Sequence, residues 1–391
     1  MTDNSDTWCP LPWIHTCVRP DNVLKPCCRF QVDHASNPAV NLDSIEEHGI
    51  DAMNHSYWTQ LRKDMLAGVK RKECSKCHVQ EETKLDDRGS MRQFLSKRFS
   101  SVITNDDCKE QFDSLRYIEM SIDNICNLQC KMCDSKFSSR LQLRDKFLGN
   151  TVHKKLEPNF KKFDNVDLSK LVYVKLLGGE PFMTPNFIKF IDYLLERVDP
   201  NNVSIEIATN GTVIPSKEVI EKLNQFNILY INVSLDSMDL SNDYQRHGSS
   251  YITIFNNTKL YETIFKNIHV SIHSVISILN ANTLANTLDV LIGQHNYHVS
   301  VDFVRDPGHL SLLYAPTDFL NKILEINSSN NTAYKLISTF IKSANYNKAI
   351  WQEFLNSIPT LDNFYNTDLK DYNMFLYNYI NFDGTLEELL L

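Results

Sequence analysis

Short apolar runs alternate with amphipathic stretches through the middle of the chain, from residue 113 to residue 305. Six of these runs have the length and the β-branched and aromatic content of strands; they are residues 115–122, 171–178, 203–209, 229–235, 268–276 and 299–304. Apolar residues with helical spacing fall between them, at 186–198, 216–226 and 253–267. Strands that alternate with helices pair in parallel through right-handed crossovers. The pattern therefore predicts an α/β fold, a partial (β/α)6 TIM-like barrel.

The two flanks of this segment differ from it and from each other. Residues 1–105 are turn-rich and polar and hold six of the ten cysteines, with one predicted helix at 57–68 that ends at Gly68. We expect this N-terminal domain to be stabilised by metal rather than by a large core. Residues 306–391 are rich in Asn, Tyr, Phe and Leu with helical spacing. They predict a C-terminal helical extension, in which no motif indicates chemistry.

Composition and charge indicate which partners and which cellular compartment the protein has. The 391 residues carry 40 Lys and Arg against 48 Asp and Glu, a formal net charge of -8, which does not favour general nucleic-acid binding. No apolar run approaches the roughly 20 residues that span a bilayer, and the N-terminus lacks the pattern of a secretory signal. We expect a cytoplasmic protein without a membrane partner, whose clustered cysteines bind metal in a reducing compartment.

Three cysteines follow the first predicted strand of the barrel at short spacing. Cys126, Cys130 and Cys133 form a C-x3-C-x2-C pattern, and thiolates this close together can converge on one Fe-S cluster or one zinc ion. Three thiolates leave the fourth ligand position open, whereas a structural zinc site closes all four. The spacing therefore favours a 4Fe-4S cluster with one free iron. A zinc loop that takes its fourth ligand from elsewhere is the alternative.

This cysteine pattern, placed after the first strand of an α/β barrel, resembles the signature of the radical S-adenosylmethionine (SAM) enzymes. The resemblance implies that SAM binds the open iron through its amino and carboxylate groups. It also implies that one electron cleaves SAM to methionine and a 5'-deoxyadenosyl radical, which abstracts hydrogen from the substrate. Most members of that family have an aromatic residue just before the third cysteine, where this chain has Met132.

Further motifs lie at the ends of the next strands, in the order that the family shows. The second strand ends in a sequence similar to the GGEP motif, the third in "ATNGT" and the fourth in "VSLDS". Two glycines allow close backbone approach, and a Glu carboxylate can accept from an ammonium group. The resemblance implies SAM contacts at Met132, Gly178, Gly179, Glu180, Pro181, Asn210, Ser234, Asp236 and Arg246.

The N-terminal cysteines form a second set. Cys9, Cys27, Cys74 and Cys77 resemble the first half of the auxiliary-cluster pattern of SPASM and twitch domains, with Asn22 where that pattern has Gly. The resemblance implies a second, auxiliary 4Fe-4S cluster held by these four thiolates, with Cys28 as an alternative to Cys27. Zinc is the alternative metal, because C-x2-C pairs are ordinary zinc ligands. In most SPASM and twitch enzymes this domain follows the barrel, and here it precedes it.

These expectations combine into one leading function and two alternatives. The domains are a twitch-like auxiliary domain at 1–105, a radical SAM barrel at 113–305 and a helical extension at 306–391. The resemblance implies a radical SAM enzyme acting on a peptide or protein residue, with a flavodoxin- or ferredoxin-like protein as one-electron donor. The alternatives are a radical SAM enzyme for a small metabolite such as a sugar or nucleotide, and a zinc-stabilised binding protein without catalysis. No residue is assigned as a catalytic acid or base.

Overall fold

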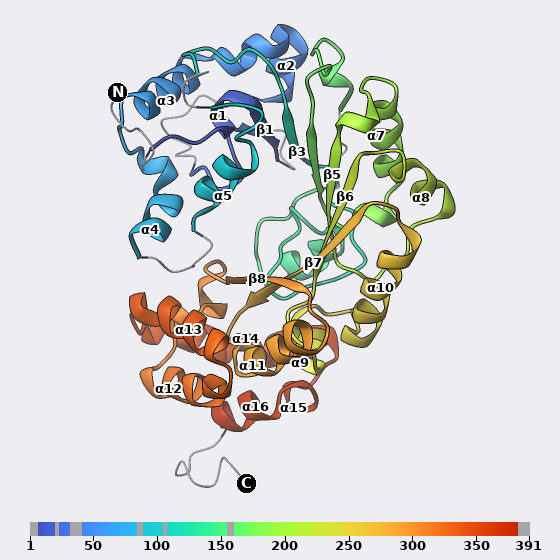
Figure 1. Cartoon of the computed structure of the whole chain (residues 1–391). Coiled ribbons are helices and arrows are strands. Elements are labelled where there is room, and N and C mark those ends of the chain that lie inside the picture. The colour runs from blue at the N-terminus through green and yellow to red at the C-terminus, as the bar shows by residue number, and fades with distance from the viewer. Residues whose placement is uncertain are drawn as a thin grey trace. The chain divides into compact units, whose positions relative to one another are not determined.

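The computed structural model describes residues 7–19, 23–31, 41–83, 89–104, 108–154 and 160–381 (Figure 1). Asn22 lies outside these ranges. The chain divides into two compact units that are not consecutive in sequence. Unit 1 contains residues 1–124, 155–207 and 217–229, and unit 2 contains residues 125–154, 208–216 and 230–391. The division into domains at 1–105, 113–305 and 306–391 stays a prediction.

Eight strands form one sheet in the order β2-β1-β3-β4-β5-β6-β7-β8. They are β1 (His15–Val18), β2 (Leu24–Lys25), β3 (Tyr117–Ser121), β4 (Tyr173–Leu177), β5 (Ser204–Thr209), β6 (Ile228–Ser234), β7 (Ile268–Ile276) and β8 (His298–Phe303). β1 pairs antiparallel with β2 and parallel with β3, and β3-β4, β4-β5 and β7-β8 are also parallel. β2 and β8 are edges, so the barrel is partial and unclosed, and the six predicted strands are confirmed as β3 to β8.

Unit 1 contains the N-terminal helices and two crossover helices of the barrel. They are α1 (Leu11–Ile14), α2 (Leu42–His48), α3 (Ser56–Leu66), α4 (Ser75–Thr83), α5 (Met91–Arg98), α7 (Pro185–Leu195) and α8 (Lys217–Leu223). β3, β4 and β5 each bury aliphatic side chains at alternate positions, such as Ile118, Val174 and Ile205. Period-2 burial of this kind marks the apolar face of a sheet. The apolar stripe of α7 supplies further core residues, among them Phe187 and Phe190.

The region that we predicted as a separate N-terminal domain contributes a strand to the barrel sheet. β1 lies parallel to β3, with Cys17 opposite Glu119. β1 is only four residues long and buried at every position, so neither alternation nor length marks it in the sequence. Cys9 therefore lies shortly before a strand of the barrel sheet, and Cys27, Cys74 and Cys77 lie between β2 and β3 in the chain.

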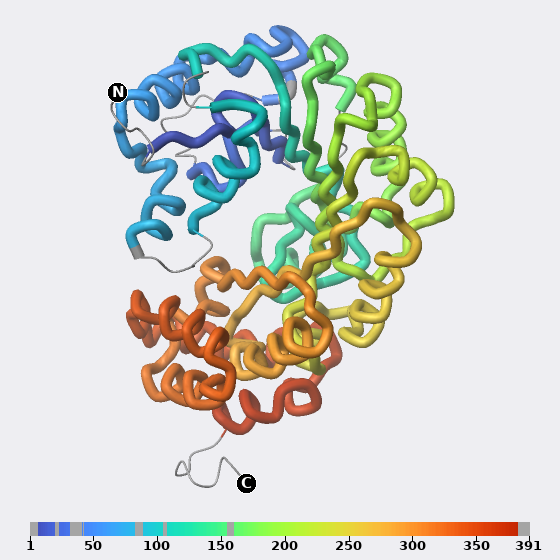
Figure 2. The backbone as a smooth tube through the Cα atoms, in the orientation of Figure 1, coloured from blue at the N-terminus to red at the C-terminus, as the bar shows by residue number. Residues whose placement is uncertain are grey.

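Unit 2 contains the C-terminal strands and the remaining helices. The helices are α6 (Gln142–Phe147), α9 (Leu240–Gln245), α10 (Tyr251–Ile264), α11 (Leu284–Leu288), α12 (Thr317–Ile326), α13 (Asn331–Phe340), α14 (Lys348–Tyr365), α15 (Leu369–Tyr372) and α16 (Met374–Asn381). One apolar cluster joins the end of β7 and α11 to the C-terminal helices through Leu284, Phe319, Ile337 and Phe354. The predicted helical extension is thus confirmed, and Figure 2 traces it as the orange and red part of the backbone.

Within the described residues, no helix combines the length and the apolar character that crossing a bilayer requires.

Candidate functional site

The three-cysteine loop follows β3 without regular secondary structure and belongs to unit 2 from residue 125 on. Cys126 is buried, and Cys130 and Cys133 are partly exposed. The backbone turns back on itself, since Cys133 N donates to Cys130 O at 3.1 Å and Leu128 N approaches Cys126 Sγ at 3.4 Å. Burial raises the pKa of Cys130 to about 12. Because metals bind the thiolate form of cysteine, the thiol proton must leave when a metal centre binds.

Arg144 on α6 holds this loop by its backbone carbonyls. Its guanidinium donates to Cys130 O at 3.2 Å and to Cys133 O at 2.5 Å. The same side chain pairs with Asp145 at 2.6 Å, and Asp145 accepts from Ser135 N at 2.7 Å. Arg144 and Asp145 are both almost fully buried. One buried side chain therefore fixes the backbone carbonyls of the second and third cysteines.

The other side of the loop is paired with the segment that follows α9. Gln129 N donates to His247 O at 2.9 Å, and Lys131 N donates to Gln245 O at 2.8 Å. Arg246 lies between these acceptors, and its guanidinium makes a two-point ion pair with Asp236, at 2.7 and 2.8 Å. The structure thus brings two predicted SAM contacts together and ties their segment to the cysteine loop.

Asn210 also lies beside this loop. Its amide donates to Asn127 Oδ1 at 2.8 Å and lies 3.9 Å from Cys126 Sγ, while its Oδ1 accepts from Thr212 N at 2.9 Å. The turn needs glycine at position 211, because φ is +73° and a Cβ there would lie 2.8 Å from Val233 Cγ1. Ser234, another predicted SAM contact in this unit, is the last residue of β6.

The C-terminal helix α14 reaches the same loop, which the sequence did not indicate. Lys131 Nζ donates to Tyr244 O at 2.9 Å and lies 3.6 Å from the ring centre of Tyr244 and 4.8 Å from that of Tyr365. Tyr365, the last residue of α14, also packs on His247 at 4.4 Å between ring centres. Met132 packs against the apolar cluster of unit 2. The C-terminal extension therefore supports the cysteine loop.

The GGEP-like segment belongs to unit 1 and is packed against Asp123. Gly178 has φ +144°, and a Cβ there would lie 2.6 Å from Asp123 O. Gly179 N donates to that same carbonyl at 2.9 Å. Glu180 is fully buried and accepts from Phe182 N at 3.1 Å, where Pro181 begins a short 3-10 turn, Pro181–Met183. The contacted residue, Asp123, precedes Cys126 by three positions in the chain.

Gly178 offers a direct test of this packing. We expect Gly178→Ala to lower the free energy of unfolding by roughly 3 kcal/mol, since it adds a clash with a backbone oxygen to the strain of the dihedral. Gly149→Ala is the matched control, because φ is +72° there and nothing lies within 4 Å of a Cβ; it should cost only about 1–2 kcal/mol. Urea unfolding of both variants checks this, and equal costs would show that the contact with Asp123 is unimportant.

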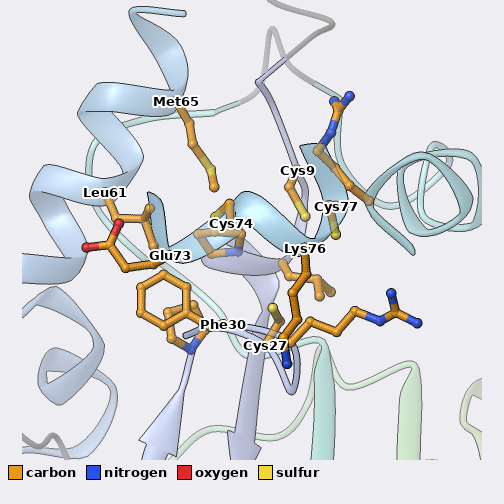
Figure 3. A pocket seen from close by; sticks show the side chains of 14 residues that line it. Cys9, Cys27, Phe30, Leu61, Met65, Glu73, Cys74, Lys76 and Cys77 are labelled. Atoms are coloured by element: carbon orange, nitrogen blue, oxygen red, sulfur yellow. The ribbon is translucent and has the colours of Figure 1, made fainter. Parts of the chain in front are cut away.

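The four N-terminal cysteines line one pocket of unit 1. Cys9 precedes α1, Cys27 follows β2, Cys74 ends the 3-10 turn Lys72–Cys74, and Cys77 lies in α4. Figure 3 shows these side chains reaching into the pocket from their separate segments. Burial raises the pKa of Cys74 to about 12, and the nearby Cys77 adds to the rise. The structure therefore places these four cysteines, from separate segments of the chain, on the lining of one pocket.

Apolar and charged residues complete the lining of this pocket. Leu61, Met65 and Phe30 supply an apolar wall. Arg92, which the sequence analysis did not assign, also lines it; its guanidinium donates to Glu81 at 2.6 Å and to Trp8 O at 2.8 Å, next to Cys9. As the side chains stand in the described ranges, no three His, Cys, Asp or Glu residues are grouped closely enough for a single metal ion.

Cys27 and Cys28 are separated by this arrangement. Cys27 lines the pocket with the other three cysteines, and Cys28 does not. Cys28 is exposed as a residue, but its thiol is surrounded by protein and lies within hydrogen-bond reach of the buried Glu119 on β3. The surrounding protein and the Glu119 carboxyl raise its pKa to about 12. The side chains of these two adjacent cysteines point in different directions, so that Cys27 lines the pocket and Cys28 lies beside Glu119.

Most of the barrel is similar to a known protein family. Residues 120–291 match the family model described as the Radical SAM superfamily. The match covers less than half of the chain, and over these residues the barrel is similar to radical SAM domains. The enzymes of that superfamily use a 4Fe-4S cluster and SAM as cofactors. The matched residues include the three-cysteine loop and all the predicted SAM contacts.

Curated relatives of this chain are distant and longer than the segment that they share with it. The uncharacterized protein MJ0907 of Methanocaldococcus jannaschii is 24% identical over 54% of this chain and 71% of its own length. Radical SAM cyclopropyl synthase TigE of Paramaledivibacter caminithermalis is 28% identical over 54% of this chain and 44% of its own. GTP 3',8-cyclase of Clostridium acetobutylicum is 27% identical over 32% of this chain and 36% of its own length. The chain therefore spans less than half the length of the two named enzymes.

Solved structures with a similar barrel show only remote likeness. Native anSMEcpe with bound AdoMet has 14% identity and a TM-score of 0.39 over 55% of this chain and 59% of its own. Streptococcus suis SuiB bound to precursor peptide SuiA has 15% identity and a TM-score of 0.36, over 86% of this chain and 71% of its own.

Proposed function

We propose that this protein reductively cleaves SAM at a 4Fe-4S cluster held by Cys126, Cys130 and Cys133 and abstracts hydrogen from a substrate. When bound, cluster and SAM supply the 5'-deoxyadenosyl radical. The observation that carries the proposal is the loop itself: three thiols on a backbone that Arg144 and residues 245–247 hold in place. The fold keeps this incomplete ligand set together through contacts that do not involve the thiols.

The chain's own residues would bind and orient SAM around this loop. Gly178 and Gly179 follow the end of β4 and carry no side chain, and Glu180 offers a buried carboxylate to an ammonium group. Asn210 and the ion pair of Asp236 with Arg246 supply polar groups beside the cysteines. Met132, Pro181 and Ser234 remain proposed contacts by their positions in the family motifs. Positioning of this kind is the main task of a protein whose cofactor performs the difficult step.

We further propose that Cys9, Cys27, Cys74 and Cys77 hold a second 4Fe-4S cluster, which makes the N-terminal region a twitch-like auxiliary domain. The support is that these four thiols, and not Cys28, line one pocket with an apolar wall. Four thiolates satisfy all four irons, so this cluster would exchange electrons and would not bind substrate directly. Zinc held by the same four thiolates remains the alternative.

Iron analysis tests both sites at once. After anaerobic reconstitution we expect about eight irons per chain, four for each cysteine-ligated cluster. Cys27→Ala should lower this to about four, because the auxiliary site loses a ligand, whereas Cys28→Ala should keep the full count. Inductively coupled plasma analysis for iron and zinc reads out all three proteins. Zinc in place of iron at either site would contradict the corresponding assignment.

For the substrate we propose a peptide or protein residue, on the resemblance of the N-terminal cysteine pattern to SPASM and twitch domains. The similarity to GTP 3',8-cyclase favours a second candidate, a nucleotide or another small metabolite. An external one-electron donor of the flavodoxin or ferredoxin type would supply the electron. The test is to reconstitute the protein, add SAM and dithionite, and compare 5'-deoxyadenosine formation with peptide and metabolite fractions of a cell extract. A peptide fraction that leaves the rate unchanged, beside a metabolite fraction that raises it, would replace the first candidate by the second.

A further inference from the structure

Exposed apolar side chains gather on the segment that follows the three-cysteine loop, residues 134–154 of unit 2. Leu143 is 72% exposed, more than any other large apolar side chain that the structure describes, and Phe147, one turn later on α6, is 54% exposed. Phe137, Leu148 and Val152 are exposed as well. Single exposed apolar residues are ordinary, but a group of them on one short segment marks an interaction site. We call these residues the apolar surface.

Hydrogen bonds hold the parts of this segment together. Ser135 N donates to Asp145 Oδ2 at 2.7 Å, and Ser135 Oγ accepts from His153 N at 2.9 Å. The side-chain amide of Gln142, the first residue of α6, donates to His153 O at 2.8 Å. The stretches that carry the apolar surface, before α6, on it and after it, are therefore joined into one structure.

Helix α6 has an inner face toward the cysteine loop and an outer face. Arg144 lies on the inner face and donates to Cys130 O and Cys133 O, at 3.2 and 2.5 Å. Leu143 and Phe147 lie on the outer face, where they are exposed. The apolar surface is thus the outer side of the same short segment that holds the proposed cluster ligands.

The apolar surface also lies close to the cysteine loop along the chain. Phe137 follows Cys133 by four residues, and a chain of that length spans at most about 14 Å when fully extended. The chain is not extended here, because Phe137 N donates to Asp134 O at 3.2 Å. Electron tunnelling weakens steeply with distance, so a redox partner bound at this surface would be well placed to reduce a cluster in the loop.

Basic side chains accompany the apolar residues along the segment. Arg140, Lys146 and Lys154 are exposed and Lys136 is partly exposed, whereas Asp134 is the one exposed carboxylate between residues 134 and 154, a range that the structure describes throughout. This local excess of positive charge contrasts with the formal net charge of -8 of the whole chain. A basic patch attracts an acidic partner and steers its approach.

We propose that the apolar surface and the basic side chains beside it are the docking site for an acidic electron carrier of the flavodoxin type. The flavin of such a carrier presents the apolar edge of its ring system at the surface, which suits the exposed aromatic rings of Phe137 and Phe147. This inference rests on the proposed function, because that function requires an electron. One electron passes from the reduced flavin to the oxidised cluster, no bond forms or breaks, and the carrier leaves oxidised by one electron.

Apolar and basic side chains together would also suit an anionic membrane surface or a second copy of the chain. Neither occupant accounts for the position of the apolar surface directly outside the cysteine loop. Redox encounters of this kind bury small interfaces and depend on charge, which agrees with a few apolar residues and several basic ones.

The first test measures binding and needs no turnover. Reconstituted full-length protein is titrated with oxidised flavodoxin by isothermal calorimetry at low salt. The test variant combines Leu143→Glu with Lys146→Glu, and the control combines Ile252→Glu with Lys342→Glu, which makes the same charge change at exposed positions of the same unit. We expect the Kd to rise by about tenfold or more in the test variant and to stay near wild type in the control. Equal Kd values for the two variants would overturn the proposal.

The second test compares two reductants in the formation of 5'-deoxyadenosine from SAM. Dithionite is small and needs no docking site, so the test variant should keep the wild-type rate with dithionite. With reduced flavodoxin its rate should fall by about tenfold or more, and about 0.5 M salt should slow wild type in the same way. An unchanged rate with flavodoxin, or a loss seen with ferredoxin alone, overturns the proposal. Absence of 5'-deoxyadenosine from wild type with dithionite counts instead against the proposed function, and the calorimetry still decides the docking site.

The two other occupants are tested with the same variants. Sedimentation velocity measures self-association, and co-sedimentation with phosphatidylglycerol vesicles measures membrane binding. We expect the test variant and the control to behave alike in both experiments. If the test variant alone loses self-association or vesicle binding while flavodoxin binding is unchanged, the surface belongs to that occupant and the proposal is wrong.

Discussion

Cys130→Ala is expected to abolish reductive cleavage of SAM while leaving the fold intact. The variant removes the middle one of three thiolates, and a cluster held by two protein ligands is lost or disordered. The rate of 5'-deoxyadenosine formation should fall by more than about 100-fold, because even an outer partner of a metal site is worth about 10- to 100-fold. The iron content should fall by about four per chain, because the variant leaves the proposed auxiliary site unchanged. Liquid chromatography of the product and iron analysis measure both.

Cys17→Ala is the control for this experiment. Cys17 is a buried thiol on β1 that belongs to neither cysteine set, so its loss should leave both the rate and the iron content near wild type. Electron paramagnetic resonance of the reduced proteins adds a second readout, since the signal that changes when SAM is added should be missing only from Cys130→Ala. If Cys130→Ala still cleaves SAM at the wild-type rate, the assignment of the three-cysteine loop as the SAM site is wrong.

The strands of the barrel could be predicted from the sequence because each carries a local signal. β3 to β8 are runs of β-branched and aromatic residues bounded by polar segments, and amphipathic helices such as α7 separate them. β1 has no such signal. It is a four-residue strand that is buried at every position, and it exists because β3 offers an edge with unpaired backbone groups. Such a strand forms because it pairs with a neighbouring strand in the folded protein, and its own residues do not predict it.

The candidate site likewise contains residues that the sequence predicts and residues that only the structure reveals. Cysteine spacing and glycine pairs are sequence signals, so Cys126, Cys130, Cys133 and Gly178 could be named in advance. Arg144 could not, since an arginine on a short helix is usually exposed, and only the structure shows it buried against the cysteine loop. The sequence leaves the choice between Cys27 and Cys28 open, because spacing does not distinguish adjacent residues, and only the folded chain shows that Cys27 is the one that lines the pocket.

The largest expected effect outside the cysteines belongs to Arg144. Arg144→Leu leaves the Asp145 carboxylate buried without its partner and frees the carbonyls of Cys130 and Cys133. Loss of one member of a buried ion pair costs about 3–5 kcal/mol, so the midpoint of urea unfolding should fall accordingly. The matched control is Arg140→Leu, since Arg140 donates to the same loop, at Asn127 O, from an exposed position. Its cost should stay within about 0.5 kcal/mol.

A double variant separates the stability of Arg144 from its role in shaping the loop. Arg144→Leu with Asp145→Leu removes the uncompensated charge, and replacing a whole buried pair by apolar residues is often nearly neutral. The double variant should therefore recover most of the unfolding free energy. It should still retain fewer irons at the three-cysteine site and cleave SAM more slowly, because Cys130 O and Cys133 O have lost their donor in both variants. Recovery of iron and rate together with stability would show that Arg144 serves the fold alone, and that the loop takes its shape from the pairing with residues 245–247.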